Sequence, residues 1–153
     1  MATKKAKQKV VLASGVFDLI HLGHVRFLEE AKRAGGENAK LIVIIARDSN
    51  VEKMKGRKPI MSEDQRRVLV ESLKVVDEAV LGYVNFDIGE VIEKIKPDVI
   101  ALGYDQAEME HGVEKYIAEN KLPVDVVKIG RFGEKALDSS SKIKQKIIEK
   151  LSK

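Results

Sequence analysis

The chain contains no cysteine and no tryptophan, and only three histidines and three prolines among its 153 residues. Without cysteine there is no disulfide framework, thiolate metal site or thiol nucleophile, and a reducing, cytoplasmic setting is expected. No apolar run approaches the roughly 20 residues of a membrane-spanning helix. The basic N-terminus is followed directly by a strand-like segment rather than by the apolar core of a signal peptide. We therefore expect no association with a membrane.

The composition is that of an ordinary globular protein, with 44% hydrophobic and 34% charged residues. A length of 153 residues suits one domain with a single core. We expect a basic tail at residues 1–9 and a folded domain at residues 10–153. The formal net charge of +4 favours anionic partners, among which nucleotides, nucleic acids and acidic surfaces remain open.

Apolar segments alternate with amphipathic ones along the chain. VVLAS at Val10–Ser14 and LIVIIA at Leu41–Ala46 read as buried strands, and DEAVLG, DVIALG and VDVVKIG are weaker examples. Helical patterns lie between them, beginning after the first strand and ending with SSSKIKQKIIEKL. This alternation predicts an α/β fold: a single Rossmann-like, doubly wound parallel sheet of about five strands, with helices on both faces.

Ligands of such a sheet bind beyond the carboxyl ends of its strands. Polar and small residues gather at four of these ends in the sequence. The segment starting at Gly15 follows the first strand, Arg47 and Asp48 follow the second, and Asp105 and Arg131 follow the fourth and fifth. We expect the functional site at this rim.

His21 and His24 stand just beyond the first strand, at the start of a predicted helix. A metal site is poorly supported, because His111 is the only other histidine and cysteine is absent. Gly15 allows close approach of the backbone to a ligand, and a helix N-terminus attracts phosphate. We therefore interpret the two imidazoles as cationic donors to a phosphate chain.

The stretch GVFDLIHLGH resembles the HxGH signature of the nucleotidyltransferase superfamily. The chain is similar to glycerol-3-phosphate cytidylyltransferases and closer to archaeal-type FAD synthases in ARDSNVEKMKGRKPIMSEDQRR, IALGYDQ and SSSKI. The resemblance implies transfer of a nucleoside monophosphate from a nucleoside triphosphate to a phosphate acceptor, with release of pyrophosphate. We also expect Mg²⁺ or another divalent cation, bound mainly through the triphosphate because the sequence shows no dedicated set of metal ligands. The resemblance further implies a homodimer.

The resemblance also implies roles for individual residues. The expected catalytic residues are His21, His24 and Lys55. The expected nucleotide-binding residues are Val16, Phe17, His21, His24, Asp105, Arg131, Ser139, Ser140 and Ser141. The expected acceptor-binding residues are Asp48 and Arg57, where Arg57 stands in place of the family's lysine and keeps its charge with a different geometry.

Several of these residues have an alternative, purely structural interpretation. The basic segment from Lys53 to Lys58 is either a solvated loop or a flexible lid over phosphates. The serines from Ser139 to Ser141 cap the last helix whether or not they also bind phosphate. Isolated aspartates after strands are commonly turn or cap residues, and we expect Asp18 to hold its loop in place rather than to react.

Three functions remain open from the sequence. The first is FAD synthesis from ATP and FMN, and the second is CTP-dependent transfer to glycerol 3-phosphate or a similar small phosphate. The third is non-enzymatic binding of a nucleotide or nucleic acid, against which the aromatic content of 5% argues. A flavin would need an apolar slot, for which the sequence offers Phe17, Met54, Met61, Tyr104 and Met109.

Overall fold

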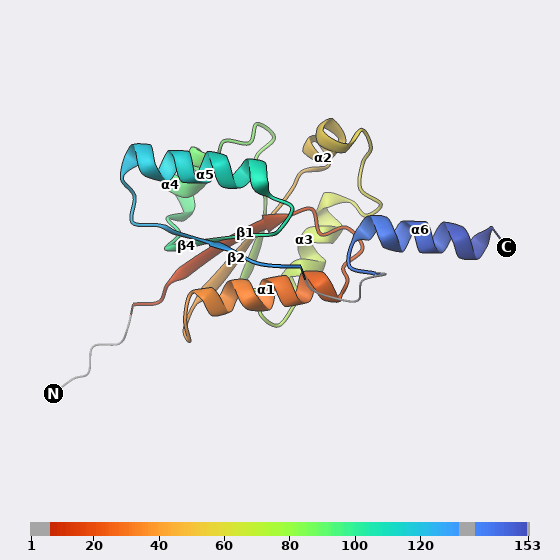
Figure 1. Cartoon of the computed structure of the whole chain (residues 1–153), viewed down its shortest axis with the longest axis horizontal. Helices are drawn as coiled ribbons and strands as arrows, with labels where there is room; N and C mark the ends of the chain where they lie inside the picture. Colours follow the sequence, from red (N-terminus) through yellow and green to blue (C-terminus); the bar gives the residue numbers. More distant parts are fainter. Residues whose placement is uncertain (1–6, 132–136, 153) are drawn as a thin grey trace.

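A five-stranded sheet forms the centre of the computed structural model, which describes residues 7–131 and 137–152 (Figure 1). Most of the expected basic tail, residues 1–6, lies outside the described residues. The strands run parallel in the order β3-β2-β1-β4-β5. They are β1 Val10–Gly15, β2 Lys40–Ile45, β3 Glu78–Leu81, β4 Val99–Leu102 and β5 Asp125–Lys128. The predicted fold class is confirmed, and the strand order reverses beside β1.

Helices cover both faces of the sheet, as predicted. One face carries α1 Leu22–Ala34 and α3 Glu63–Glu71, and the other carries α4 Ile88–Ile95 and α5 Ala107–Asn120 (Figure 1). Side chains of the strands alternate between the two layers: Val11 and Ala13 pack with α1, whereas Leu12 packs with α4 and α5. Two apolar layers therefore hold the strand ends in fixed positions.

The segment after β2 differs from the expected basic loop. Helix α2 spans Asp48–Lys55 and ends at Gly56, whose φ of 76° is the left-handed conformation that glycine adopts without strain. Val51 on this helix is buried, and Asp48 lies in its first turn. The loop prediction was thus wrong for Lys53 to Lys55, which form the last helical turn, and only residues 56–58 belong to a loop.

Helix α6, Ser140–Leu151, extends away from the sheet (Figure 1). None of its residues is buried, and Ser139 caps its N-terminus by accepting a hydrogen bond from the Lys142 amide. Its first turn nevertheless reaches the carboxyl edge of the sheet, because the Ser140 hydroxyl donates to the Asp18 carbonyl. Among the described residues, no helix has the length and apolar character needed to span a membrane.

Candidate active site

A cleft of about 990 Å³ opens at the carboxyl edge of the sheet. It is bounded by the segments that follow β1, β2, β3 and β4 and by the start of α6. Eleven of the twelve residues expected at the site line it: Val16, Phe17, His21, His24, Lys55, Arg57, Asp105, Arg131, Ser139, Ser140 and Ser141. Asp48 is the exception.

The segment after β1 has an unusual backbone. Phe17 and Leu19 adopt positive φ angles of 56° and 52°, and the Phe17 side chain is buried. A Cβ atom on Gly15 would lie 2.8 Å from Cε2 of Phe17. Gly15 is therefore required to make room for the Phe17 ring, a reason the sequence pattern did not suggest. Within the described residues, the Val16 and Phe17 amides donate no hydrogen bond, which leaves both available to a ligand.

The two histidines cap α1. The His21 Nδ1 atom accepts from the Gly23 amide at 3.1 Å, and the His24 Nδ1 atom accepts from the His21 amide at 3.2 Å. The rings stack with centroids 3.8 Å apart, and Phe17 packs against His24 with centroids 5.4 Å apart. Because each Nδ1 accepts, the proton of each neutral ring lies on Nε2, which becomes the hydrogen-bond donor.

Burial and, to a smaller extent, the neighbouring His21 lower the pKa of His24 to about 4, against the opposing effect of Asp18. Burial also lowers the pKa of His21, while Asp138 opposes this shift. Both rings are therefore neutral donors near neutral pH in the free protein, whereas the sequence suggested cationic donors. Phosphate binding would favour the protonated forms and reverse part of these shifts.

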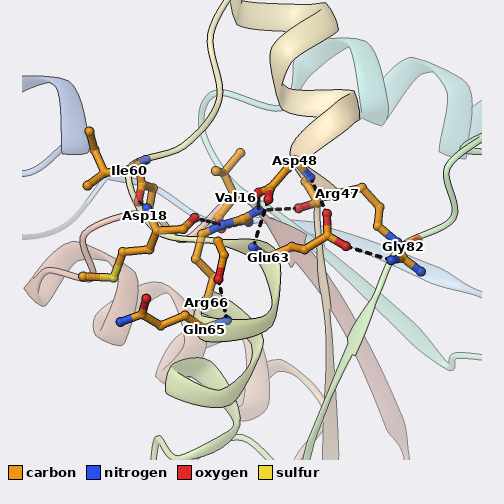
Figure 2. Close-up of polar contacts among 12 residues, drawn as sticks. Val16, Asp18, Arg47, Asp48, Ile60, Glu63, Gln65, Arg66 and Gly82 are labelled. Atoms are coloured by element: carbon orange, nitrogen blue, oxygen red, sulfur yellow. Dashed lines mark hydrogen bonds and ion pairs between the residues drawn. The ribbon is translucent and has the colours of Figure 1, made fainter.

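Arg66 joins three segments beneath the cleft (Figure 2). Its guanidinium is fully buried and donates to the carbonyls of Val16 at 2.7 Å, Ala46 at 2.9 Å and Met61 at 3.0 Å. It also contacts the Asp48 carboxylate. A buried arginine is stable only when its donors and charge are satisfied in this way. Arg66 thus fixes the segments after β1 and β2 relative to α3.

The Asp48 side chain points into this network (Figure 2), and Asp48 is not among the residues that line the cleft. Its carboxylate accepts from Arg66 at 2.6 Å and from the Glu63 amide at 3.3 Å. Glu63 in turn accepts from the Asp48 amide at 2.9 Å and pairs with Arg47 at 2.8 Å. The structure does not bring Asp48 together with the other expected site residues, because Arg66 and α3 engage its side chain.

Asp18 holds the loop after β1, as expected. Its buried carboxylate accepts from the amides of Ile60 at 2.8 Å and Met61 at 3.0 Å and lies 3.4 Å from Lys144 Nζ. Although burial raises the pKa of Asp18, the two amides and Lys144 outweigh burial and hold it below its usual value. The carboxylate is therefore an ionised structural bridge between this loop, the start of α3 and α6.

Arg131 lies at the end of β5 and bonds to Asp138. Its Nε is 2.6 Å and its Nη2 is 2.8 Å from the two Asp138 oxygens, and its guanidinium lies 4.8 Å from the centroid of the Tyr104 ring. Lys142 Nζ contacts the same carboxylate at 2.8 Å. The hydrogen bonds from Arg131 and Lys142 lower the pKa of Asp138 to about 2.

Apolar side chains from the segment after β3, from the start of α4, from α2 and from α5 line the cleft, and we call them the apolar wall. Its members are Tyr83, Phe86, Ile88, Met54 and Met109. Phe86 is 43% exposed and Met54 is 71% exposed, so both present apolar surface to the cleft. Of the residues considered for a flavin slot, Phe17, Met54, Tyr104 and Met109 line the cleft, whereas Met61 does not.

Sequence reasoning missed Arg66, Asp138 and the wall residues Tyr83 and Phe86. Tyr83 could have been found, because it lies just beyond the end of the third strand, where ligands of a parallel sheet bind. No comparable signal marks Arg66, because an arginine in a polar helix is usually exposed. Within the described residues, no cluster of three or more histidine, aspartate or glutamate side chains is arranged to hold a metal ion.

The chain is similar to proteins of known family over most of its length. A model of the cytidylyltransferase-like family matches residues 12–146. The FAD synthase of Aciduliprofundum boonei is 46% identical over 92% of this chain and 91% of its own length. That of Ferroglobus placidus is 51% identical over 92% of this chain and 88% of its own length. The crystal structure of the lipopolysaccharide core biosynthesis protein of Thermoplasma volcanium superimposes with a TM-score of 0.74 and 38% identity, covering 83% of this chain and all of that one.

Proposed function

Because this chain belongs to the cytidylyltransferase-like family, we propose that its cleft transfers AMP from ATP to FMN, giving FAD and pyrophosphate. The observation that carries the proposal is the similarity to FAD synthases over about nine-tenths of the chain. The residues that line the cleft agree with it, since phosphate-binding groups and an apolar wall occur in one cavity.

The reaction requires no nucleophile from the protein. An oxygen of the FMN phosphate attacks the α-phosphorus of ATP, and the bond to the bridging oxygen breaks as pyrophosphate leaves. Catalysis then consists of alignment and stabilisation of charge on the phosphate oxygens. We assign the amides of Val16 and Phe17 to the α-phosphate, and the Nε2 donors of His21 and His24 to the charge that develops toward the leaving group.

The other expected residues surround this centre. Ser139 to Ser141 line the cleft at the start of α6, and the hydroxyls of Ser139 and Ser141 are offered to the outer phosphates, whereas the Ser140 hydroxyl donates to the Asp18 carbonyl. Lys55 and Arg57 lie at the end of α2 and just beyond it, where they line the cleft and supply positive charge. We propose that Mg²⁺ enters with ATP and is held mainly by the triphosphate oxygens.

The apolar wall favours FMN over glycerol 3-phosphate as the acceptor. The isoalloxazine ring is planar and largely apolar, so it gains from contact with Phe86, Ile88 and Met109, whereas glycerol would leave these side chains uncovered. The backbone at the Tyr83 end of the wall is held in place, because Arg47 Nε donates to the Gly82 carbonyl at 2.7 Å and Asn50 donates to the Tyr83 carbonyl at 2.9 Å.

A substrate matrix tests the proposal. Purified protein is offered ATP or CTP with FMN or glycerol 3-phosphate, and pyrophosphate and the nucleotide product are measured. FAD formed from ATP and FMN supports the proposal. CDP-glycerol formed from CTP and glycerol 3-phosphate would show instead that the protein is a cytidylyltransferase. No product in any combination, together with tight binding of oligonucleotides, would indicate a non-enzymatic binder.

We also propose a homodimer, as the resemblance implies. The exposed side chains of Ile147, Ile148 and Leu151 on α6 offer apolar surface that an assembly of two chains would cover. Light scattering tests this, with twice the chain mass expected and a single chain mass contradicting it.

A further inference from the structure

We propose that Asp138 is a positioning residue that holds Arg131 ready for the nucleotide, an inference that rests on the proposed use of ATP. Asp138 lies seven residues beyond Arg131 and directly before the cap of α6. Its side chain is 6% exposed, and the residue lines the same cleft as Arg131. The two residues therefore meet at the edge of the site, not on a remote surface.

The contact uses only part of the guanidinium. Asp138 accepts from Nε and from Nη2, so one edge of the Arg131 group is held in a planar, two-point contact. Among residues 7–131 and 137–152, no hydrogen bond engages Nη1, so this edge of the five-donor guanidinium fork can bind another anion. The ring of Tyr104 supports one face of the group at 4.8 Å.

This arrangement restricts a side chain that would otherwise be mobile. Arg131 is 41% exposed, and an exposed arginine samples many rotamers whose entropy is lost on binding. Asp138 and Tyr104 already order Arg131 in the folded protein. Less rotamer entropy is therefore lost when the triphosphate binds. The positive charge of Lys142 on α6 offsets the negative charge of the Asp138 carboxylate. This reduces the repulsion between Asp138 and a phosphate bound by Arg131.

A competing role for Asp138 predicts the opposite effect on ATP affinity. A carboxylate that merely occupied the place of a phosphate would compete with ATP, and its removal would tighten nucleotide binding. Two-point contact from one edge of Arg131 and support from Tyr104 favour the positioning role, for which removal weakens binding.

The test is a double-mutant cycle with Asp138→Ala, Arg131→Ala and the combined variant. Affinity for ATP is measured by calorimetry without FMN, and KM for ATP and FMN and kcat by FAD formation. We expect Asp138→Ala to raise Kd and KM for ATP about tenfold, which is the scale of one charge-assisted hydrogen bond, with little change in KM for FMN. The combined variant should bind ATP as weakly as Arg131→Ala alone, since Asp138 acts through Arg131.

Asp77→Asn is the matched control, because Asp77 pairs with Lys32 at 3.0 Å but precedes β3 and does not line the cleft. Thermal unfolding establishes that each variant is folded, and Asp138→Asn replaces Asp138→Ala if the latter is not. Tighter or unchanged ATP binding by the variant would overturn the proposal, as would additive losses in the combined variant. Failure to form FAD while ATP binding follows the expected cycle would refute the proposed function and leave this inference standing.

Discussion

The Nη2 atom of Arg66 lies 2.6 Å from Oδ1 of Asp48, and this ion pair lies under the cleft with the arginine completely buried. The same guanidinium holds the carbonyls of Val16, Ala46 and Met61. An internal charge thus connects the loop after β1, which carries the proposed phosphate-binding amides, to the segment that starts α2.

Replacing Arg66 by alanine should destabilise the protein strongly. The substitution leaves the Asp48 carboxylate without its ion-pair partner and three carbonyls without a donor, which costs about 3–5 kcal/mol in free energy of unfolding. Urea denaturation measures this. Arg67→Ala is the control, because Arg67 is partly exposed and its pair with Glu71 contributes at most about 1 kcal/mol. A loss below about 1 kcal/mol for Arg66→Ala would show that the network does not hold the site.

Substitution of Gly15 by alanine should distort the phosphate-binding loop. The added methyl would lie 2.8 Å from the Phe17 ring, which also packs against His24. We expect this overpacking to lower the free energy of unfolding by about 1–3 kcal/mol. We also expect kcat of Gly15→Ala to fall further than kcat of a variant whose substitution is remote from the loop. Gly35→Ala is the control, since its added Cβ would lie 2.5 Å from Cγ2 of Val11 but Gly35 does not line the cleft, so it should lose stability without a comparable fall in kcat. Equal kinetics for both variants would contradict the steric account.

The low pKa of His24 makes stability depend on pH in a defined direction. Its pKa is about 4 in the folded protein and 6.5 for the ordinary side chain, so the unfolded chain binds the proton first as the pH falls. The contribution is therefore complete above pH 6.5 and is lost between 6.5 and about 4. His21, whose pKa is also lowered, acts in the same direction.

His24→Gln separates this effect from capping. Glutamine at this helix position can still reach back to the His21 amide as in a capping box, but it does not titrate. The free energy of unfolding from denaturant titrations, followed from about pH 7 to pH 4.5, should fall less steeply for the variant than for the wild type. If the two curves run parallel, the pKa of His24 is not lowered in the folded protein, and this account of its titration is wrong.

Replacing Phe86 by alanine should raise KM for the acceptor FMN and leave KM for ATP unchanged. Its exposed ring forms part of the apolar wall, and loss of an aromatic contact of about 0.5–1.5 kcal/mol on Phe86→Ala corresponds to a rise in KM for FMN of about two- to tenfold. Val84→Ala is the control, because Val84 is exposed nearby in sequence but does not line the cleft. A change in KM for ATP alone would place the flavin elsewhere.

The order of elements and the position of the site could be predicted from local patterns. The strands at Val10–Gly15 and Lys40–Ile45 can be identified from their runs of apolar residues. Parallel strands then bring their carboxyl ends to one edge of the sheet. Helix ends are harder to predict. The apolar pattern after Ser62 continues to Val76, but the helix ends at Glu71, where the Ser72 hydroxyl donates to the Val68 carbonyl. Such local competition is not visible in an apolar pattern.

Charges that act inside the protein could not be predicted from the sequence. Arg66 and Asp138 are paired with residues far away in the sequence or outside the helical repeat, such as Val16 for Arg66 and Arg131 for Asp138. Asp48 illustrates the same limit, since its motif suggested the acceptor site while its contacts are with Arg66 and Glu63. Motifs indicate which residues lie near the chemistry, and long-range hydrogen bonds decide where each side chain points.

The most direct measurement compares the rate of FAD formation from ATP and FMN for the wild type and His24→Ala, at saturating substrates. The wild type should form FAD and pyrophosphate in equal amounts, and the variant should lose about 10²–10³ in kcat while its thermal unfolding stays cooperative. A variant with the wild-type rate would remove the imidazoles from the mechanism, and a wild type that forms no FAD would contradict the function itself.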